Sequence, residues 1–407
     1  MTEKKKYLAI FCPYKNTNSL NTTHNFTLKK IAKNFEKIYY INTENLIFFP
    51  KKYLHNLDDI KKGLPENIIL FNPKDSKEFS NFLNDKDLLV INFFGRYFPQ
   101  IKIHYLLKKF KIKQIQITNV GQINWTQTTT TKHFLKTIIY RTKKFMPKIC
   151  LMLANIGLIQ KIDIRFVSNK NFLKMISKNK IKNFLYNKKF FFAKELIVVN
   201  SLANDILLDE GKNISEDYIV HLDYNLNHYH EVELRGIMPQ EIIDKHYFYL
   251  KKFLKELSST YNKEVKVCVH PQYNIKEHQK NLPDFEVIKF KTRELIYKAF
   301  IVTLFDSSSV IDAILLKKKI IGITSDNMGP NNIRQSQAYS NLVGYLNFNI
   351  KNEIPDEKNL LNNLEKNILN YDNYINNYIS FDSGKLGIDK IISVIKERYF
   401  VKKNMRQ

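Results

Sequence analysis

Short apolar runs alternate along this chain with segments whose apolar residues recur every three or four positions. The run YLAIFCPYK (7–15) has the composition of a buried strand, NFTLKKIAKNF (25–35) has helical spacing, and KIYYINTEN (37–45) again has strand character. Short apolar strands that alternate with helices predict a parallel sheet with helices on both faces. The chain therefore begins with a predicted βαβ unit.

The same alternation continues and predicts a first Rossmann-like domain over residues 1–206. Its further predicted elements are strands in DLLVINFFG (87–95), KQIQITNVG (113–121) and KELIVVNS (194–201), and a helix in QIKIHYLLKKF (100–110). No Gly-rich phosphate loop follows the first strand, which argues against nicotinamide or flavin chemistry. We expect no cofactor.

A polar stretch, LLDEGKNISED (207–217), is predicted to link this domain to a second Rossmann-like domain over 218–407. The second series contains strands in YIVHLD (218–223), VKVCVHP (265–271), FEVIKF (285–290), IVTLFD (301–306) and KIIGITS (319–325), and helices over 239–261, over 292–300 with Thr292 as its cap, and over 307–318. The predicted fold class is therefore α/β, with two Rossmann-like lobes of the GT-B type and a cleft between them.

Length and composition agree with a folded two-domain protein. The chain has 407 residues, of which 44% are hydrophobic and 13% aromatic, so it can bury a large core and does not have the composition of a disordered protein. The longest apolar run, ICLMLANIGLI (149–159), has about half the roughly 20 residues of a membrane-spanning helix. Cys12, Cys150 and Cys268 lack the paired spacings of a zinc site or a disulfide framework. We expect a cytoplasmic protein.

The positive charge is concentrated in one part of the first domain. The formal net charge is +26, and residues 131–196, predicted to be mainly helical, contain 16 Lys and Arg against only Asp163 and Glu195. Such a region could lie on the anionic inner-membrane surface, bind a polyanion, or form a solvated helical face. The aromatic residues form no recognisable stacking motif, so binding to nucleic acid is not expected.

Two groups of polar residues follow strands of the second predicted domain. His270 and Pro271 end one strand, and Asp306, Ser307, Ser308 and Ser309 separate another strand from a helix. In a parallel sheet ligands bind at the carboxyl ends of the strands. Hydroxyls and free backbone N–H groups at the start of a helix favour an anion, so a phosphate is expected there. A serine that merely caps the helix is the simpler alternative.

This pair of motifs resembles those of bacterial CMP-sugar glycosyltransferases: sialyltransferases, polysialyltransferases and Kdo transferases. The resemblance covers about residues 219–325. It implies a GT-B fold in which His270 and the serine hydroxyls hold the cytidine monophosphate leaving group. Pre-placed donors of this kind stabilise the charge that develops on a departing phosphate. Lys291, with Arg293, could add positive charge near the same edge.

The reaction also needs a carboxylate, for which the sequence offers two candidates. Asp223 ends the first strand of the second domain and could act as a general base or as a nucleophile; a turn or helix cap is the alternative. Asp209-Glu210-Gly211 resembles the acidic motif of some bacterial sialyltransferases, although it follows a helix in the predicted linker. His221, His228 and His230 lie close together in sequence, but their spacing does not favour a metal site, and none is expected.

The sequence thus predicts a glycosyltransferase that moves an acidic sugar, such as sialic acid, Kdo or a related sugar, from a CMP donor to a cell-surface glycan or glycolipid. Lipopolysaccharide and capsule are the expected kinds of acceptor, and the basic region would place the enzyme at the inner membrane. Two alternatives stay open. One is a CDP-polyol phosphotransferase of surface polymer synthesis, although the His-Gly-Thr motif typical of that group is absent. The other is a non-catalytic membrane-binding or glycan-binding protein.

Overall fold

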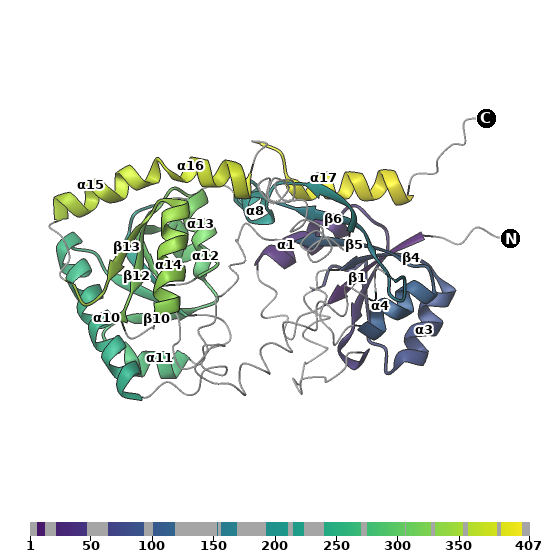
Figure 1. The fold of residues 1–407 in the computed structure, drawn as a ribbon, viewed down its shortest axis with the longest axis horizontal. Coiled ribbons are helices and arrows are strands. Elements are labelled where there is room, and N and C mark those ends of the chain that lie inside the picture. The colour runs from purple at the N-terminus through teal and green to yellow at the C-terminus, as the bar shows by residue number, and fades with distance from the viewer. Residues whose placement is uncertain are drawn as a thin grey trace. The chain divides into compact units, whose positions relative to one another are not determined.

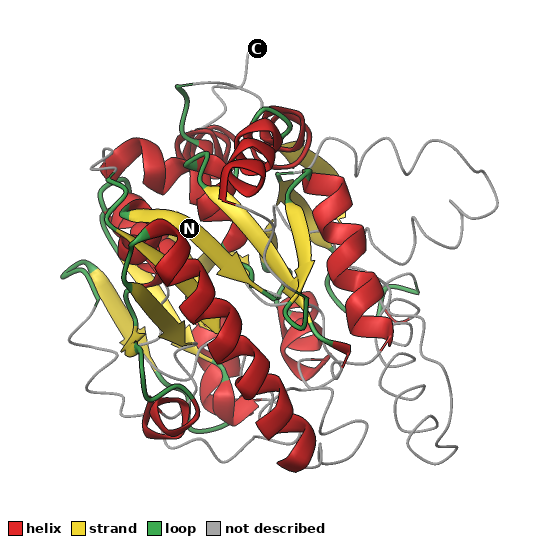
Figure 2. Ribbon diagram, turned by 90° about the vertical axis from the view of Figure 1, so that its left-hand side faces the viewer, coloured by secondary structure: helices red, strands yellow, loops and turns green. Residues whose placement is uncertain are grey.

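The architecture comes from a computed structural model of the chain. It describes residues 6–12, 22–46, 64–92, 101–118, 153, 156–168, 193–210, 215–223, 240–269, 275–305, 307–326, 330–352, 357–380 and 384–400. Helices and strands mostly alternate along these segments. Figure 2 draws the helices in red and the strands in yellow.

The chain divides into two compact units. The first comprises Met1–Val120, Ile138–Asp209 and Asp382–Gln407, and the second comprises Gly121–Thr137 and Glu210–Phe381. The predicted division at 206/218 assigned the whole C-terminal part to the second domain. Here the chain returns to the first unit after Phe381. Helix α8 (Leu202–Glu210) also extends into the predicted linker.

The first unit contains a seven-stranded parallel sheet in the order β3-β2-β1-β4-β5-β6-β7. Figure 1 labels its strands β1, β4, β5 and β6. The strands of this sheet are β1 (Lys6–Cys12), β2 (Ile38–Asn42), β3 (Ile68–Phe71), β4 (Asp87–Asn92), β5 (Lys113–Thr118), β6 (Ile162–Val167) and β7 (Ala193–Val198). Strand β6 lies within the basic region 131–196 that was predicted to be helical, and most of the rest of that region is outside the described residues. The apolar side chains of β6 stand at alternate positions, a pattern that fits a strand better than a helix.

Apolar side chains cover both faces of this sheet. Leu8 and Ile10 of β1 belong to one buried cluster, and Ala9 and Phe11 belong to another. Successive side chains of a strand point to opposite faces, so the continuous apolar run of β1 reflects burial on both sides. Among the described residues of this unit, the helices are α1 (Thr22–Ala32), the short η2 (Glu44–Leu46), α3 (Ser76–Asp85), α4 (Ile101–Lys109), α8, α17 (Gly387–Ile395) and η7 (Lys396–Phe400).

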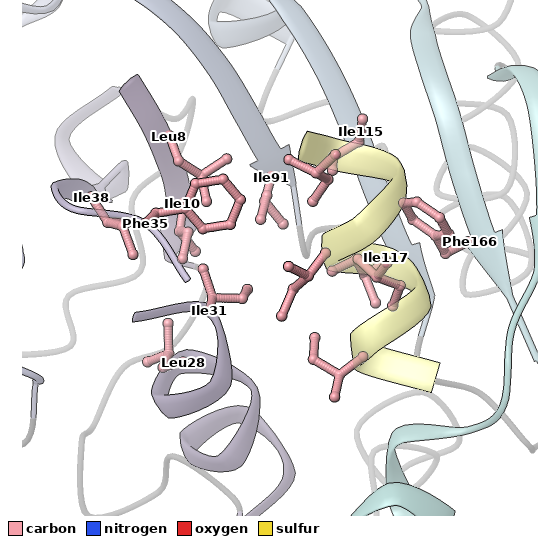
Figure 3. Close-up of a cluster of buried hydrophobic side chains, with 14 of the residues drawn as sticks. Leu8, Ile10, Leu28, Ile31, Phe35, Ile38, Ile91, Ile115, Ile117 and Phe166 are labelled. Carbon is pink, nitrogen blue, oxygen red and sulfur yellow. The ribbon is translucent and has the colours of Figure 1, made fainter. Parts of the chain in front are cut away.

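Helix α17 completes one of these clusters. Its Ile388, Ile391, Ile392 and Ile395 are at most 4% exposed and pack with Leu8, Ile10 and Ile115 of the sheet. Figure 3 shows the labelled strand side chains facing the pale yellow helix of the C-terminal segment. Complete burial of an Ile side chain contributes roughly 1.5–3 kcal/mol, so the C-terminal helix is a structural part of the first unit.

The second unit contains a six-stranded parallel sheet in the order β10-β9-β8-β11-β12-β13. Its strands are β8 (Tyr218–Asp223), β9 (Val265–Val269), β10 (Glu286–Lys289), β11 (Ala299–Leu304), β12 (Lys319–Thr324) and β13 (Leu346–Asn349). Its helices are α10 (Gln240–Tyr261), α11 (Ile275–Asn281), α12 (Thr292–Tyr297), α13 (Val310–Leu315), α14 (Pro330–Val343), α15 (Glu357–Ile368), α16 (Tyr371–Tyr374) and the π-helix η6 (Ile375–Ile379). The predicted α/β class with two parallel sheets is confirmed.

Helix α10 shows why the second sheet forms a stable layer. Its 22 residues place Ile243, Tyr247, Leu250, Phe253, Leu254 and Leu257 on one buried face. These positions recur every three or four residues, as expected for a helix that packs one side on a sheet.

Among the described residues, no helix is long and apolar enough to cross a membrane.

Candidate functional site

The strands of the second sheet end side by side at one edge. Asp223, the last residue of β8, pairs with Val269 at the end of β9. On the other side of β8, Leu222 pairs with Leu304 at the end of β11. The carboxyl ends of three neighbouring parallel strands therefore meet at this edge, where α/β proteins bind their ligands.

Part of the predicted site falls within the described residues. Asp223, Lys291, Ser307, Ser308 and Ser309 can be placed. His270, Pro271 and Asp306 lie outside the described residues, as do His228 and His230. In the sequence, His270 comes directly after the last residue of β9, and Ser307 comes three residues after the end of β11. The ends of these two strands lie on either side of Asp223.

Asp223 belongs to a buried cluster of polar side chains. Its Oδ2 lies 2.5 Å from Nδ1 of His278 and accepts a 3.4 Å hydrogen bond from the hydroxyl of Tyr247. Its Oδ1 lies 3.5 Å from Nε2 of His221, and the side chains of Asp223, His221 and His278 are each only 1% exposed. Asp223 and His221 of β8 thus contact side chains from α10 and α11. His221 also contacts Thr303 of β11.

Thr303 fixes the second histidine of this cluster. Nδ1 of His221 lies 2.9 Å from Oγ1 of Thr303, and Thr303 is itself completely buried. The hydrogen bond leaves Nε2 of His221 directed to the carboxylate. A histidine whose two ring nitrogens face a hydroxyl and a carboxylate is held in one orientation.

The surroundings of Asp223 keep it ionised. Burial by itself would raise the pKa of Asp223, but His221 and His278 beside the carboxylate hold the pKa well below its usual range. A carboxylate with such a low pKa is a weak base, since general-base catalysis is most effective when the pKa lies near the working pH. This geometry suits a carboxylate that orients histidines better than one that removes a proton.

A third histidine lies near the cluster. Burial lowers the pKa of His246 to about 4, even though the charge of Asp223 opposes that shift. Its ring packs edge-on against Tyr247 at a centroid distance of 5.4 Å. His246 is therefore neutral near pH 7, and it contributes volume and shape to the cluster without adding charge.

Sequence reasoning missed His246 and His278 as members of this cluster. His278 lies 55 residues after Asp223, and a lone histidine in a short helix carries no pattern that connects it with a strand. One signal was available. Helix α11 follows the predicted His270-Pro271 motif by only a few residues, so a polar residue on its buried face had to lie near the same strand ends.

The serines have a different local structure from the one predicted. Ser309 is the N-cap of α13, but its side chain makes no capping hydrogen bond. The backbone N–H groups of Val310, Ile311 and Asp312 already donate to the carbonyls of Ser307, Ser308 and Ser309, respectively. An anion at this turn would therefore bind hydroxyls rather than those three amides, which corrects the expectation of free N–H groups at the helix start.

The two basic residues of FKTREL behave differently. Lys291 is exposed and is the residue before α12, whose N-cap it forms without a side-chain bond. Thr292, predicted as the cap, is instead the first helical residue, and its Oγ1 lies 3.2 Å from the thiol of Cys268. Arg293 donates to Asp312 at 2.9 Å, and both side chains are nearly buried. Arg293 thus ties α12 to α13 and is not a solvated charge.

The acidic motif Asp209-Glu210 lies at the boundary of the two units, with Asp209 in the first and Glu210 in the second. It ends helix α8, and Asp209 forms an exposed ion pair with Lys30 at 2.5 Å. A helix end paired with a surface lysine is a structural arrangement of small energetic weight. Within the described part of the chain, no three His, Cys, Asp or Glu residues form a group that could hold a metal ion.

Comparisons with known proteins identify the fold. No protein-family model matches the sequence, and no curated protein matches it. Among solved structures, Arabidopsis thaliana UGT89C1 complexed with UDP-L-rhamnose is similar with a TM-score of 0.50 at 10% identity, over 97% of this chain and 100% of that one. The wall teichoic acid polymerase TagF, soaked with CDPG, is similar with a TM-score of 0.53 at 12% identity, over 97% and 88%. The fold is of the GT-B type.

GT-B is the fold that the sequence analysis predicted. The likeness extends over nearly the whole chain, so it includes both parallel sheets. At 10–12% identity it concerns the fold alone, because one fold can carry different reactions. The reaction has to be argued from the residues at the strand ends.

Proposed function

We propose that the protein is a glycosyltransferase that uses a nucleotide-activated donor, with the donor's phosphate at the carboxyl edge of the second sheet. The observation that carries this proposal is the convergence of Asp223, the end of β9 and the Ser307–Ser309 turn at neighbouring strand ends. The GT-B fold supports it, since UGT89C1 was solved with UDP-L-rhamnose and TagF with CDPG.

The proposed donor is a CMP-activated acidic sugar, and the proposed acceptor is a cell-surface glycan or glycolipid. The support is the His270-Pro271 and Ser307–Ser309 pair, which resembles the motifs of CMP-sugar transferases. In such a reaction the bond between the sugar's anomeric carbon and the phosphate oxygen breaks, and CMP leaves. The oxygen of an acceptor hydroxyl forms the new bond to the anomeric carbon and loses its proton to a base. Hydroxyl donors at Ser307 and Ser308 would stabilise the charge that grows on the departing phosphate.

Asp223 has a supporting role in this proposal. Its side chain is 1% exposed and is held between two histidines, so it would orient His278 on α11, the helix that follows the His270-Pro271 motif. The sequence-based alternative, in which Asp223 is itself the base or nucleophile, requires the carboxylate to reach the substrate. Nucleotide binding and turnover of an Asp223 variant separate the two roles.

Nucleotide preference is the first test. Thermal unfolding is measured with CMP, CDP, UDP and GDP, and CMP is expected to stabilise the protein most, by roughly 2.7 kcal/mol at about a hundred times its dissociation constant. Ser308→Ala should weaken this effect. Ser393→Ala, which changes another exposed serine in the first unit, is the matched control and should not. Equal stabilisation by all four nucleotides contradicts the proposed donor class.

A CDP-polyol phosphotransferase is a second candidate, favoured by the likeness to TagF soaked with CDPG. That reaction also releases CMP, but it transfers a polyol phosphate and leaves the phosphate bond to the polyol intact. Incubation with CMP-sialic acid, CMP-Kdo and CDP-glycerol, followed by measurement of released CMP, distinguishes the two. Release from CDP-glycerol alone selects the phosphotransferase. No release from any donor favours a non-catalytic binding protein.

The inner-membrane surface remains the proposed location of the acceptor. The support is the surplus of Lys and Arg in 131–196, most of which lies outside the described residues. Binding to vesicles should rise with their content of anionic lipid and fall with salt, with a contribution of roughly 1 kcal/mol for each well-placed Lys or Arg. Binding that ignores lipid charge contradicts this location.

A further inference from the structure

A pocket opens at the amino-terminal edge of the first sheet, and none of the site residues discussed above lines it. It has a volume of about 380 Å³, which falls in the range of small-molecule sites. Lys6, Asp87 and Lys113, the first residues of β1, β4 and β5, line it together with residues that follow α3 and α4 and with η7. Strands β1, β4 and β5 are neighbours in the sheet, so these three positions lie next to one another.

The lining of this pocket is basic. Its lining includes four lysines, Lys6, Lys86, Lys111 and Lys113, and a single carboxylate, that of Asp87. Among the described residues, no carboxylate lies within ion-pair distance of any of the four lysines. The charge of the fifth cation, Arg398, is offset by Glu195. The pocket therefore carries a surplus of positive charge that no carboxylate in the described part of the chain neutralises.

Aromatic rings form another part of the lining. Phe110, Tyr399 and Phe400 are partly buried there. The ammonium group of Lys113 lies 5.4 Å from the ring centroid of Tyr399, and that of Lys86 lies 5.0 Å from the ring of Phe82. Such contacts hold lysine side chains in place without neutralising their charge. Fixed cations beside apolar rings suit an anion attached to an apolar group.

Helix termini offer a simpler reason for the lysines, because α3 and α4 both end at this pocket. A helix C-terminus carries a partial charge of about −0.5, which attracts lysines. In α4, however, the N–H groups of Phe110, Lys111 and Ile112 already donate to the carbonyls of Leu106, Lys108 and Leu107, respectively. Two half-charges also do not balance four full ones. Helix ends therefore explain part of the positive charge of the lining and leave the rest unexplained.

We propose that this pocket binds a phosphate-bearing ligand with an apolar portion. The phosphate would interact with Lys86, Lys111 and Lys113, and the apolar portion would contact Phe110 and Tyr399. The same chemistry occurs in a free organic phosphate and in the headgroup of an anionic lipid. This site is separate from the donor site proposed above and does not depend on the glycosyltransferase assignment.

Lys111 allows a test that does not endanger the fold. Its φ is +55°, a left-handed conformation that glycine adopts without strain, so Lys111→Gly removes one charge and is expected to stabilise the protein. Lys317 has a φ of +52°, follows α13 and lies in the second unit. Lys317→Gly is therefore a control that is matched in charge and in backbone conformation.

Isothermal titration calorimetry with phenyl phosphate and inorganic phosphate provides the first measurement. Phenyl phosphate should bind more tightly than inorganic phosphate, and Lys111→Gly should weaken binding on the order of fivefold, as expected for one charge at close range in water. Lys317→Gly should leave the affinity unchanged. An equal loss in both variants would show a general effect of net charge and would overturn the proposal.

Vesicles distinguish the two sources of phosphate. Sedimentation is measured with phosphatidylcholine vesicles that either contain or lack phosphatidylglycerol, for the wild type and both glycine variants. Binding to the anionic vesicles that Lys111→Gly weakens and Lys317→Gly does not assigns the pocket to a lipid headgroup. Phenyl phosphate binding without such an effect on vesicles assigns it to a free phosphate. The proposal is overturned if neither probe binds, or if Lys111→Gly changes neither.

Discussion

Oδ1 of Asp205 lies 2.7 Å from the backbone nitrogen of Gly387, a residue 182 positions later in the chain. Its other oxygen, Oδ2, accepts a bond of 2.7 Å from the N–H of Ile388. One buried carboxylate of helix α8 thus accepts from the first two amides of α17, where free N–H groups and the helix dipole favour a negative charge. This contact fixes the start of the C-terminal helix on the first unit.

The stability of the protein should depend on the protonation of Asp205. Burial raises the pKa of Asp205 to about 6, outweighing the two N–H bonds that lower it. The folded protein then binds this proton more tightly than the unfolded chain. The resulting stability, on the order of 2–3 kcal/mol, is present below about pH 4 and is lost as the pH rises through about 6.

Urea unfolding followed by circular dichroism at several pH values tests this linkage. Asp205→Asn cannot titrate, so its midpoint should lack the decline that the wild type shows between about pH 4 and pH 7. Asp389→Asn, on the same C-terminal helix, is the control and should keep most of the decline. The same pH profile for wild type and Asp205→Asn would refute this role for Asp205.

Gly387 should not tolerate a side chain. A Cβ at this position would lie against the backbone oxygen of Asn200 and 2.9 Å from its carbonyl carbon, and backbone cannot move aside as a flexible side chain can. We expect Gly387→Ala to lower the free energy of unfolding by about 1–3 kcal/mol or more, as for other overpacked sites. Gly384→Ala is a control because no atom lies within 4 Å of the added Cβ, although its positive φ carries some strain of its own.

Substitution of Asp223 should affect folding as well as turnover. Asp223→Asn replaces the buried carboxylate between His221 and His278, and a buried polar group left without its hydrogen-bond partner costs about 1–3 kcal/mol. If the carboxylate positions α11, CMP binding should weaken together with thermal stability. Asp244→Asn, on the exposed side of α10, should change neither. A variant that keeps stability and CMP affinity but loses turnover would instead identify Asp223 as the base or nucleophile.

Lys318 should matter far more for stability than its neighbour Lys317. The ammonium group of Lys318 donates to the carbonyls of Ala299 at 2.8 Å and Ser215 at 2.9 Å, and the residue is only 4% exposed. Lys318→Met leaves both carbonyls without this donor and should cost about 1–3 kcal/mol. Lys317→Met removes only an exposed ion pair with Asp372 and should cost less than about 1 kcal/mol. Thermal melts of the two variants provide the comparison.

The strands that were predicted correctly share a local signal. Runs such as those of β1, β4 and β11 are largely apolar on both faces, and the next segment has helical spacing, so the sequence alone indicates buried parallel strands. Strand β6 was missed because Asp163 and Arg165 interrupt its apolar pattern. In the sheet, these positions alternate with the buried Ile162, Ile164 and Phe166.

The candidate site was predictable only where it depends on strand ends. The position of Asp223 at the end of β8 followed from the strand itself, but its contact with His278 depends on how α11 returns to the sheet. The prediction that the backbone N–H groups after Ser309 are free was wrong, because these groups donate to the carbonyls of the serine turn itself. Hydrogen bonds of this kind depend on backbone angles that residue types do not determine.

The return of the C-terminal helix has a consequence for synthesis on the ribosome. Ile388, Ile391, Ile392 and Ile395 fill the same cluster as Leu8 and Ile10, yet they are translated after the whole second unit. At about 5–20 residues per second, the 182 residues between Asp205 and Gly387 take roughly 10–40 s to translate. During that interval the nascent first unit exposes an apolar face, so binding by a chaperone is expected until the last helix emerges.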